Sequence, residues 1–182
     1  MQEVLKKINR RIYPKKLFYS PTWMILVVNN VCNLHCKMCD VGVGFEESNF
    51  YVNMLGAHPI NMPVELVKRI VDQTAASFRD TKIAFSFTEP IIYPHLVESV
   101  AYATEHRLHA QMTTNGSKLA ALSEDLVKAG IKEICVSLDG PPEIHNFIRG
   151  NKHSFEWAFA GLEKISSINK NIPELTVACA IT

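Results

Sequence analysis

Short apolar runs alternate with amphipathic stretches along most of the chain. Five of the runs have the length and the apolar or β-branched content of strands, and they span residues 24–29, 83–87, 108–113, 133–138 and 175–181. The stretches between them repeat apolar residues at helical spacing. Strands that alternate with helices pair in parallel through right-handed crossovers, so the pattern predicts an α/β fold with a parallel sheet.

Four helices are expected between the strands. The first follows Asn61 and Pro63, which favour a helix start, and the second begins near Leu96. We expect Ser123 to cap the third helix and Ser154 to cap the fourth. A sheet built this way curls toward a barrel or a doubly wound layer, and its ligand site lies at the carboxyl ends of the strands.

Three segments depart from this regular pattern. Residues 1–22 are rich in Lys and Arg, which predicts a basic helical extension ahead of a core domain at 23–182. Residues 40–61 are too long for an ordinary connection, and they form either part of a substrate mouth or a surface loop. The chain ends at Thr182 directly after an apolar strand, so we expect it to be incomplete at its carboxyl end.

Composition narrows the function without naming it. The chain has 182 residues, 47% of them hydrophobic, and a formal net charge of +1, which is typical of a globular protein. This balance calls for neither nucleic acid nor a membrane as a partner, and we expect none. No secretory leader is recognised. Of five cysteines, three fall within eight residues, which favours metal binding in a reducing compartment and predicts a cytoplasmic protein.

The three clustered cysteines directly follow the first predicted strand. Cys32, Cys36 and Cys39 are separated by three and then two residues, so one short loop can reach three iron corners of a cluster. Thiolates select iron–sulfur clusters or zinc. The spacing predicts a 4Fe–4S cluster with three protein ligands and one open iron. Cys135 and Cys179 lie within predicted strands, and we expect both to be core residues.

A structural zinc site is the alternative. His35 would be its fourth ligand, completing a Cys3His set. His35 and Cys36 are adjacent, however, and zinc sites normally draw their ligands from two separated pairs. The spacing therefore favours the cluster.

The motif CxxxCxxC, with Met38 before its last cysteine, resembles the signature of the radical S-adenosylmethionine (SAM) enzymes. The resemblance implies that the open iron binds the amine and carboxylate of SAM and that the backbone at Met38 contacts adenine. It also implies a partial (β/α)6 barrel, of which the five strands would be the first five. The chain is most similar to the branch that contains molybdenum-cofactor enzymes and peptide-modifying SPASM proteins.

The resemblance continues at the end of the second strand. Thr88, Glu89 and Pro90 are similar to the Gly-Gly-Glu-Pro segment of the family, with Phe87 and Thr88 in place of the two glycines. The resemblance implies that Thr88 and Glu89 hold the SAM ammonium group. Glu89 also suits a purely structural role, because a carboxylate at a helix start is stabilised by the helix dipole.

Two more segments of the family recur at the next strand ends. Thr114 and Asn115 are similar to a segment that lies near SAM or substrate. Ser137 matches a serine that contacts SAM, and Arg149 matches an arginine that pairs with the SAM carboxylate. A guanidinium suits that task because its fork pairs with a carboxylate at two points. We interpret Asp139 as a structural turn residue, and His145, outside the matched motifs, as a turn or substrate-edge residue.

The resemblance implies an enzyme whose reduced 4Fe–4S cluster cleaves SAM to a 5'-deoxyadenosyl radical, which removes hydrogen from a peptide or small metabolite. It also implies a reducing partner such as a flavodoxin or ferredoxin. A non-catalytic iron–sulfur or zinc-binding module remains the alternative. An electron carrier is disfavoured, because carriers generally give every iron a protein ligand.

Overall fold

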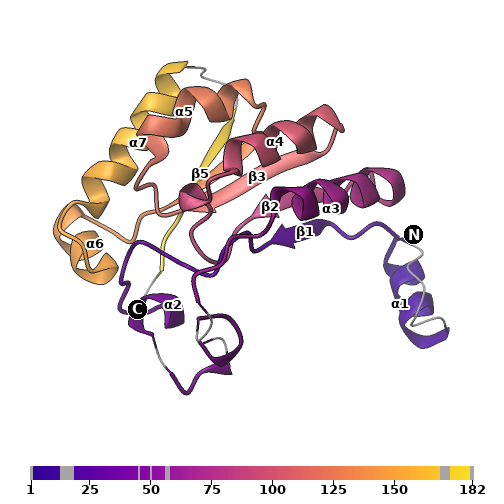
Figure 1. The fold of residues 1–182 in the computed structure, drawn as a ribbon, viewed down its shortest axis with the longest axis horizontal. Helices are drawn as coiled ribbons and strands as arrows, with labels where there is room; N and C mark the ends of the chain where they lie inside the picture. The colour runs from indigo at the N-terminus through magenta and orange to yellow at the C-terminus, as the bar shows by residue number, and fades with distance from the viewer. Residues whose placement is uncertain are drawn as a thin grey trace.

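Five parallel strands form one sheet with the strand order β1-β2-β3-β4-β5 (Figure 1). The computed structural model describes residues 2–12, 19–44, 46–49, 51–55, 58–168 and 173–180. The strands are β1 (Trp23–Leu26), β2 (Lys82–Phe85), β3 (His109–Thr114), β4 (Glu133–Ser137) and β5 (Glu174–Ala178). Each strand pairs with the next one along the chain, which is the order that successive right-handed βα units produce in a barrel.

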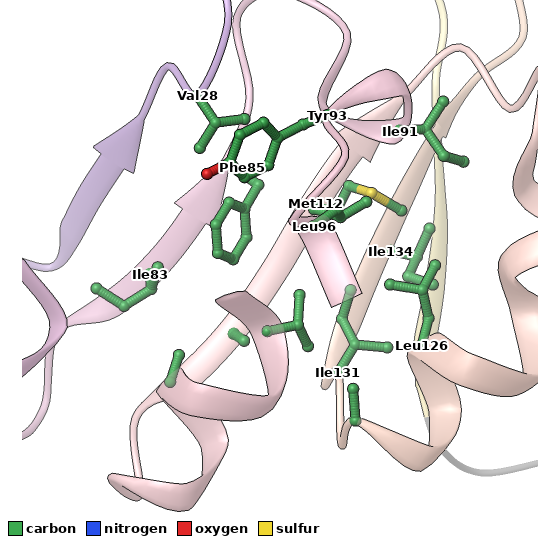
Figure 2. Close-up of a cluster of buried hydrophobic side chains, with 14 of the residues drawn as sticks. Val28, Ile83, Phe85, Ile91, Tyr93, Leu96, Met112, Leu126, Ile131 and Ile134 are labelled. Atoms are coloured by element: carbon green, nitrogen blue, oxygen red, sulfur yellow. The ribbon is translucent and has the colours of Figure 1, made fainter. Parts of the chain in front are cut away.

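Four helices connect the strands and cover one face of the sheet (Figure 1). They are α3 (Val64–Ser77), α4 (Leu96–Glu105), α5 (Leu119–Lys128) and α7 (Ser154–Ile168). The strand side chains that point toward these helices are buried, as Figure 2 shows for Ile83, Phe85, Met112 and Ile134. The alternate side chains face the opposite, concave side, where Trp23 remains 45% exposed. The single core therefore lies between the sheet and its helices.

The parallel α/β fold and its five strands are confirmed, and the four expected helices are present. The prediction for Ser123 is wrong, because α5 begins at Leu119 and Ser123 lies inside it. Its buried hydroxyl donates to the Leu119 carbonyl at 2.6 Å, the bond that a serine inside a helix makes when it does not cap one. The core prediction for Cys179 is also wrong, since this exposed residue follows the end of β5. Cys135 is half-buried on the concave face of β4.

Four short elements were not predicted. Residues 40–61 contain α2 (Asp40–Val43) and a π-helical turn, η1 (Tyr51–Leu55), and Pro90–Ile92 form a 3-10 turn, η2. Helix α6 (Pro142–Arg149) begins after a short turn that follows β4. The sequence pattern missed α6 because its Asp-Gly-Pro-Pro start is typical of a turn and its eight residues are shorter than the window over which a helical period is recognised.

The amino-terminal segment contains α1 (Gln2–Ile12), in agreement with the expected helix there. Lys15 and Lys16, which contribute to the predicted basic extension, lie outside the described residues. The division into an extension at 1–22 and a core at 23–182 remains a prediction. Among the described helices, none has the length and the hydropathy that a membrane crossing requires.

Candidate functional site

A cavity lies where the carboxyl ends of β1 to β4 meet. It is lined by Cys32, Cys36, Cys39, Val41, Ser86, Phe87, Thr88, Glu89, Thr113, Thr114, Asn115, Ser137 and Arg149. These include every site residue named from the sequence except Met38, which is 38% exposed and does not line the cavity. Parallel strands end at one edge of the sheet, so residues far apart in the sequence meet there.

The cysteine loop is held in place by close backbone contacts. The Lys37 amide donates to the Ile148 carbonyl of α6 at 2.9 Å. Gly150 has φ +67°, and a Cβ atom added there would lie 2.5 Å from the His35 carbonyl oxygen. A Cβ added to Gly42 of α2 would lie 2.4 Å from the Cys36 backbone nitrogen. Both glycines therefore allow a neighbouring element to approach the loop more closely than any larger residue could.

Two of the three thiols face an N–H donor from another element. The Asn115 side-chain amide lies 3.8 Å from Cys32 Sγ, and Arg149 Nη1 lies 3.8 Å from Cys36 Sγ. Burial raises the pKa of Cys32 to about 11, and burial also raises the pKa of Cys36 although the Arg149 guanidinium opposes it. A coordinating metal deprotonates a thiol outright, and the resulting thiolate would find these N–H donors already directed at it.

These thiols fit an iron–sulfur cluster better than the zinc alternative. His35, the fourth ligand that zinc would need, is exposed and does not line the cavity. Zn–S bonds of about 2.3 Å would bring all the ligands around a single point. In the part of the chain that is described, no three Cys, His, Asp or Glu side chains are grouped closely enough to hold one ion. Three thiols that line one cavity can instead each bind a different iron of a cluster.

Glu89 connects the ends of β2 and β3 from a buried position. Its carboxylate accepts from Thr114 Oγ1 at 2.7 Å, from the Asn115 amide at 2.7 Å and from the Ile91 amide at 3.0 Å. Glu89 is 2% exposed, and burial raises its pKa although the three donors oppose that rise. The hydrogen bond from the Ile91 amide caps η2, so Glu89 has the helix-start role that its sequence position suggested.

Arg149 is paired inside the protein with Asp139. Arg149 Nε and Nη2 lie 2.5 Å and 3.0 Å from the two Asp139 carboxylate oxygens, and the Ala180 amide donates to the same carboxylate at 3.0 Å. The Asp139 side chain is fully buried. Burial alone would raise the Asp139 pKa, but the Arg149 and Ala180 hydrogen bonds outweigh it and hold that pKa below its ordinary value. Arg149 Nη1 remains directed at Cys36.

Two sequence interpretations change with this geometry. His145 was expected at a turn or substrate edge, but it is 1% exposed inside α6, where its Nδ1 accepts from the Asp139 amide at 3.1 Å. Asp139 is structural as expected, yet it acts through Arg149 rather than through the Gly140-Pro141 turn. Sequence reasoning missed this pair, because a separation of ten residues is not a helical or strand spacing that would indicate contact.

The remaining cavity residues come from the ends of β2 and β4. Thr88 Oγ1 donates to the Asn29 carbonyl at 2.8 Å, which fixes the end of β2 against the segment after β1. Ser137 is the last residue of β4 and is half-buried. Phe87 has φ +86° and is 63% exposed. The cavity therefore combines thiols, a guanidinium, a buried carboxylate, hydroxyl groups and one aromatic side chain.

Comparison with known proteins places this geometry in a family. The model of the radical SAM superfamily matches residues 26–178. GTP 3',8-cyclase of Mycolicibacterium smegmatis is 36% identical over 116 residues, which cover 63% of this chain and 30% of that protein. Fe-coproporphyrin III synthase of Methanosarcina barkeri is 32% identical over 135 residues, which cover 72% of this chain and 30% of that protein.

Solved structures show the same fold. Streptococcus suis SuiB bound to S-adenosylmethionine has a TM-score of 0.69 at 15% identity, and the match covers 97% of this chain and 38% of SuiB. Native anSMEcpe with bound AdoMet has a TM-score of 0.66 at 20% identity, and the match covers 86% of this chain and 43% of that protein. These likenesses confirm the partial barrel. The chain spans less than half the length of each of these relatives.

Proposed function

Because this chain belongs to the radical SAM superfamily, we propose that Cys32, Cys36 and Cys39 hold a 4Fe–4S cluster and that the cavity beside them binds SAM. The observation that supports this most is the meeting of the three thiols with Glu89 and Arg149 in one cavity at the strand ends. When bound, the cluster supplies an electron that breaks SAM into methionine and a 5'-deoxyadenosyl radical, which takes hydrogen from the substrate.

In this proposal the polar side chains position SAM. The Glu89 carboxylate already accepts three hydrogen bonds, so about one of its roughly four acceptor positions is left for the SAM ammonium group. Arg149 uses Nε and Nη2 for Asp139, and one N–H of Nη1 faces Cys36, which leaves the second N–H of Nη1 for the SAM carboxylate. Thr88, Thr114, Asn115 and Ser137 surround these two groups, and the backbone at Met38 is assigned to adenine by the family resemblance.

The final substrate is proposed only as a class, a peptide or a small metabolite. One solved structure in the comparison is SuiB bound to the precursor peptide SuiA, which supports the peptide, whereas GTP 3',8-cyclase supports a small metabolite. A flavodoxin or ferredoxin is proposed as the reductant. The cytoplasmic location and the absence of nucleic-acid and membrane partners remain predictions.

The test is anaerobic reconstitution with iron and sulfide, followed by dithionite reduction and an assay of SAM conversion to 5'-deoxyadenosine. Cys36→Ala is expected to lose the product and the spectroscopic signal of the reduced cluster. Cys179→Ala is the matched control, because its thiol is exposed and outside the cavity, and it should behave as wild type. A wild-type protein that holds a reducible cluster but neither binds nor cleaves SAM would favour the non-catalytic module.

A further inference from the structure

Phe87 occupies a backbone conformation that aromatic residues rarely adopt. Its φ of +86° lies in the region that favours glycine, because a side chain there crowds the backbone. Strain of this kind lowers the folding equilibrium constant by roughly tenfold for a residue with a Cβ atom. Glycine would remove that strain, so the side chain at this position needs a reason of its own.

Packing in the core does not provide that reason. Phe85, two residues earlier on β2, is completely buried under the helices, whereas Phe87 is 63% exposed. The backbone on both sides is held without the ring, since the Ser86 amide donates to Leu26 and the Glu89 amide donates to Val31. The ring of Phe87 therefore contributes little stability that would offset the backbone strain.

The position of Phe87 in the cavity indicates a ligand contact. Phe87 lines the cavity together with Cys32 and Glu89. Glu89 is the single carboxylate among the described lining residues, and three internal donors already neutralise much of its acceptor capacity. A cationic ligand would therefore gain from a second attractive surface, and the face of an aromatic ring attracts cations, including onium groups.

We propose that the ring of Phe87 is a SAM-binding element that contacts the cationic sulfonium end of the molecule. This inference rests on the proposed function. The contact is electrostatic as well as apolar, so it distinguishes SAM from the uncharged thioether S-adenosylhomocysteine.

The experiment measures equilibrium binding of SAM and of S-adenosylhomocysteine to the reconstituted protein and to Phe87→Gly, Phe87→Leu and Phe87→Tyr. From the strength of a cation–π contact, Phe87→Gly is expected to weaken SAM binding about 3- to 30-fold and S-adenosylhomocysteine binding less. Phe87→Leu keeps apolar area without a π face, so it should lose most of the preference for SAM. Phe87→Tyr should keep that preference.

Urea unfolding of the same variants separates binding from folding. Phe87→Gly is expected to unfold at the same urea concentration as wild type or a higher one, because glycine adopts φ +86° without strain. Equal SAM affinity in wild type and Phe87→Gly would overturn the inference, and an unchanged preference in Phe87→Leu would overturn its cationic basis. A wild-type protein that carries the cluster but binds no SAM would instead overturn the proposed function itself.

Discussion

Replacing Asp139 by Asn should destabilise the protein by about 3 kcal/mol at neutral pH. The Asp139 carboxylate is fully buried, whereas the side chain of its partner Arg149 is 12% exposed. Removing one member of a buried ion pair typically costs about 3 to 5 kcal/mol, because the other charge stays desolvated. We take the lower end, since the amide oxygen of the introduced asparagine would still accept one of the three hydrogen bonds that come from Arg149 and Ala180.

The pH dependence of this effect has a defined sign. Because the folded-state pKa of Asp139 is lowered from 3.8, its stabilisation is fully present above about pH 4 and is lost as the pH falls through the lower folded pKa. The difference in free energy of unfolding between wild type and Asp139→Asn should therefore be constant from pH 5 to pH 8. Urea unfolding of the reduced, cluster-free protein, followed by circular dichroism, measures it.

A matched control is Asp125→Asn on α5, because Asp125 is an exposed residue of the same type. It should change the free energy of unfolding by less than about 0.5 kcal/mol. If Asp139→Asn were as mild as Asp125→Asn, the buried ion pair would contribute nothing to stability. The assignment of Asp139 as the residue that positions Arg149 would then be wrong.

Two further substitutions test the cavity. Burial raises the pKa of Glu89, so wild type loses stability as the pH rises from 4.5 through the folded pKa. Urea unfolding should therefore show that the free energy of unfolding of Glu89→Gln, relative to that of wild type, is higher at pH 8 than at pH 5. The reasoning would be contradicted if the free energy of unfolding of Glu89→Gln minus that of wild type stayed constant or fell between pH 5 and pH 8. Gly150→Ala should sharply reduce iron incorporation, because its Cβ would meet the His35 carbonyl. Gly44 has a similar φ of +65°, but its nearest contact is at 3.8 Å. Gly44→Ala should therefore lower the free energy of unfolding by only about 1 kcal/mol and have a smaller effect on iron content. Equal iron content in both variants would refute the close-contact argument.

The sequence was most informative at the strand ends. Cys32, Glu89, Asn115 and Ser137 each follow or end a different strand; the family resemblance selected the last three, and the parallel order predicted that such strand ends meet. The pattern failed where a decision depended on contacts between distant residues. Ser123 has the chemistry of a helix cap, yet the helix extends past it because Leu119, a completely buried core residue, starts the helix four residues earlier.

The largest feature that the sequence did not predict is the dependence of the cysteine loop on α6. Three consecutive residues at the end of this helix contact the loop: the Ile148 carbonyl accepts from Lys37, Arg149 faces Cys36, and Gly150 lies against His35. Asp139 in turn fixes Arg149 from the start of the same segment. A motif search treats the cysteines and the arginine as separate matches. Their contacts make them one unit, so a change at residue 139 or 150 should disturb the cluster site without altering any cysteine.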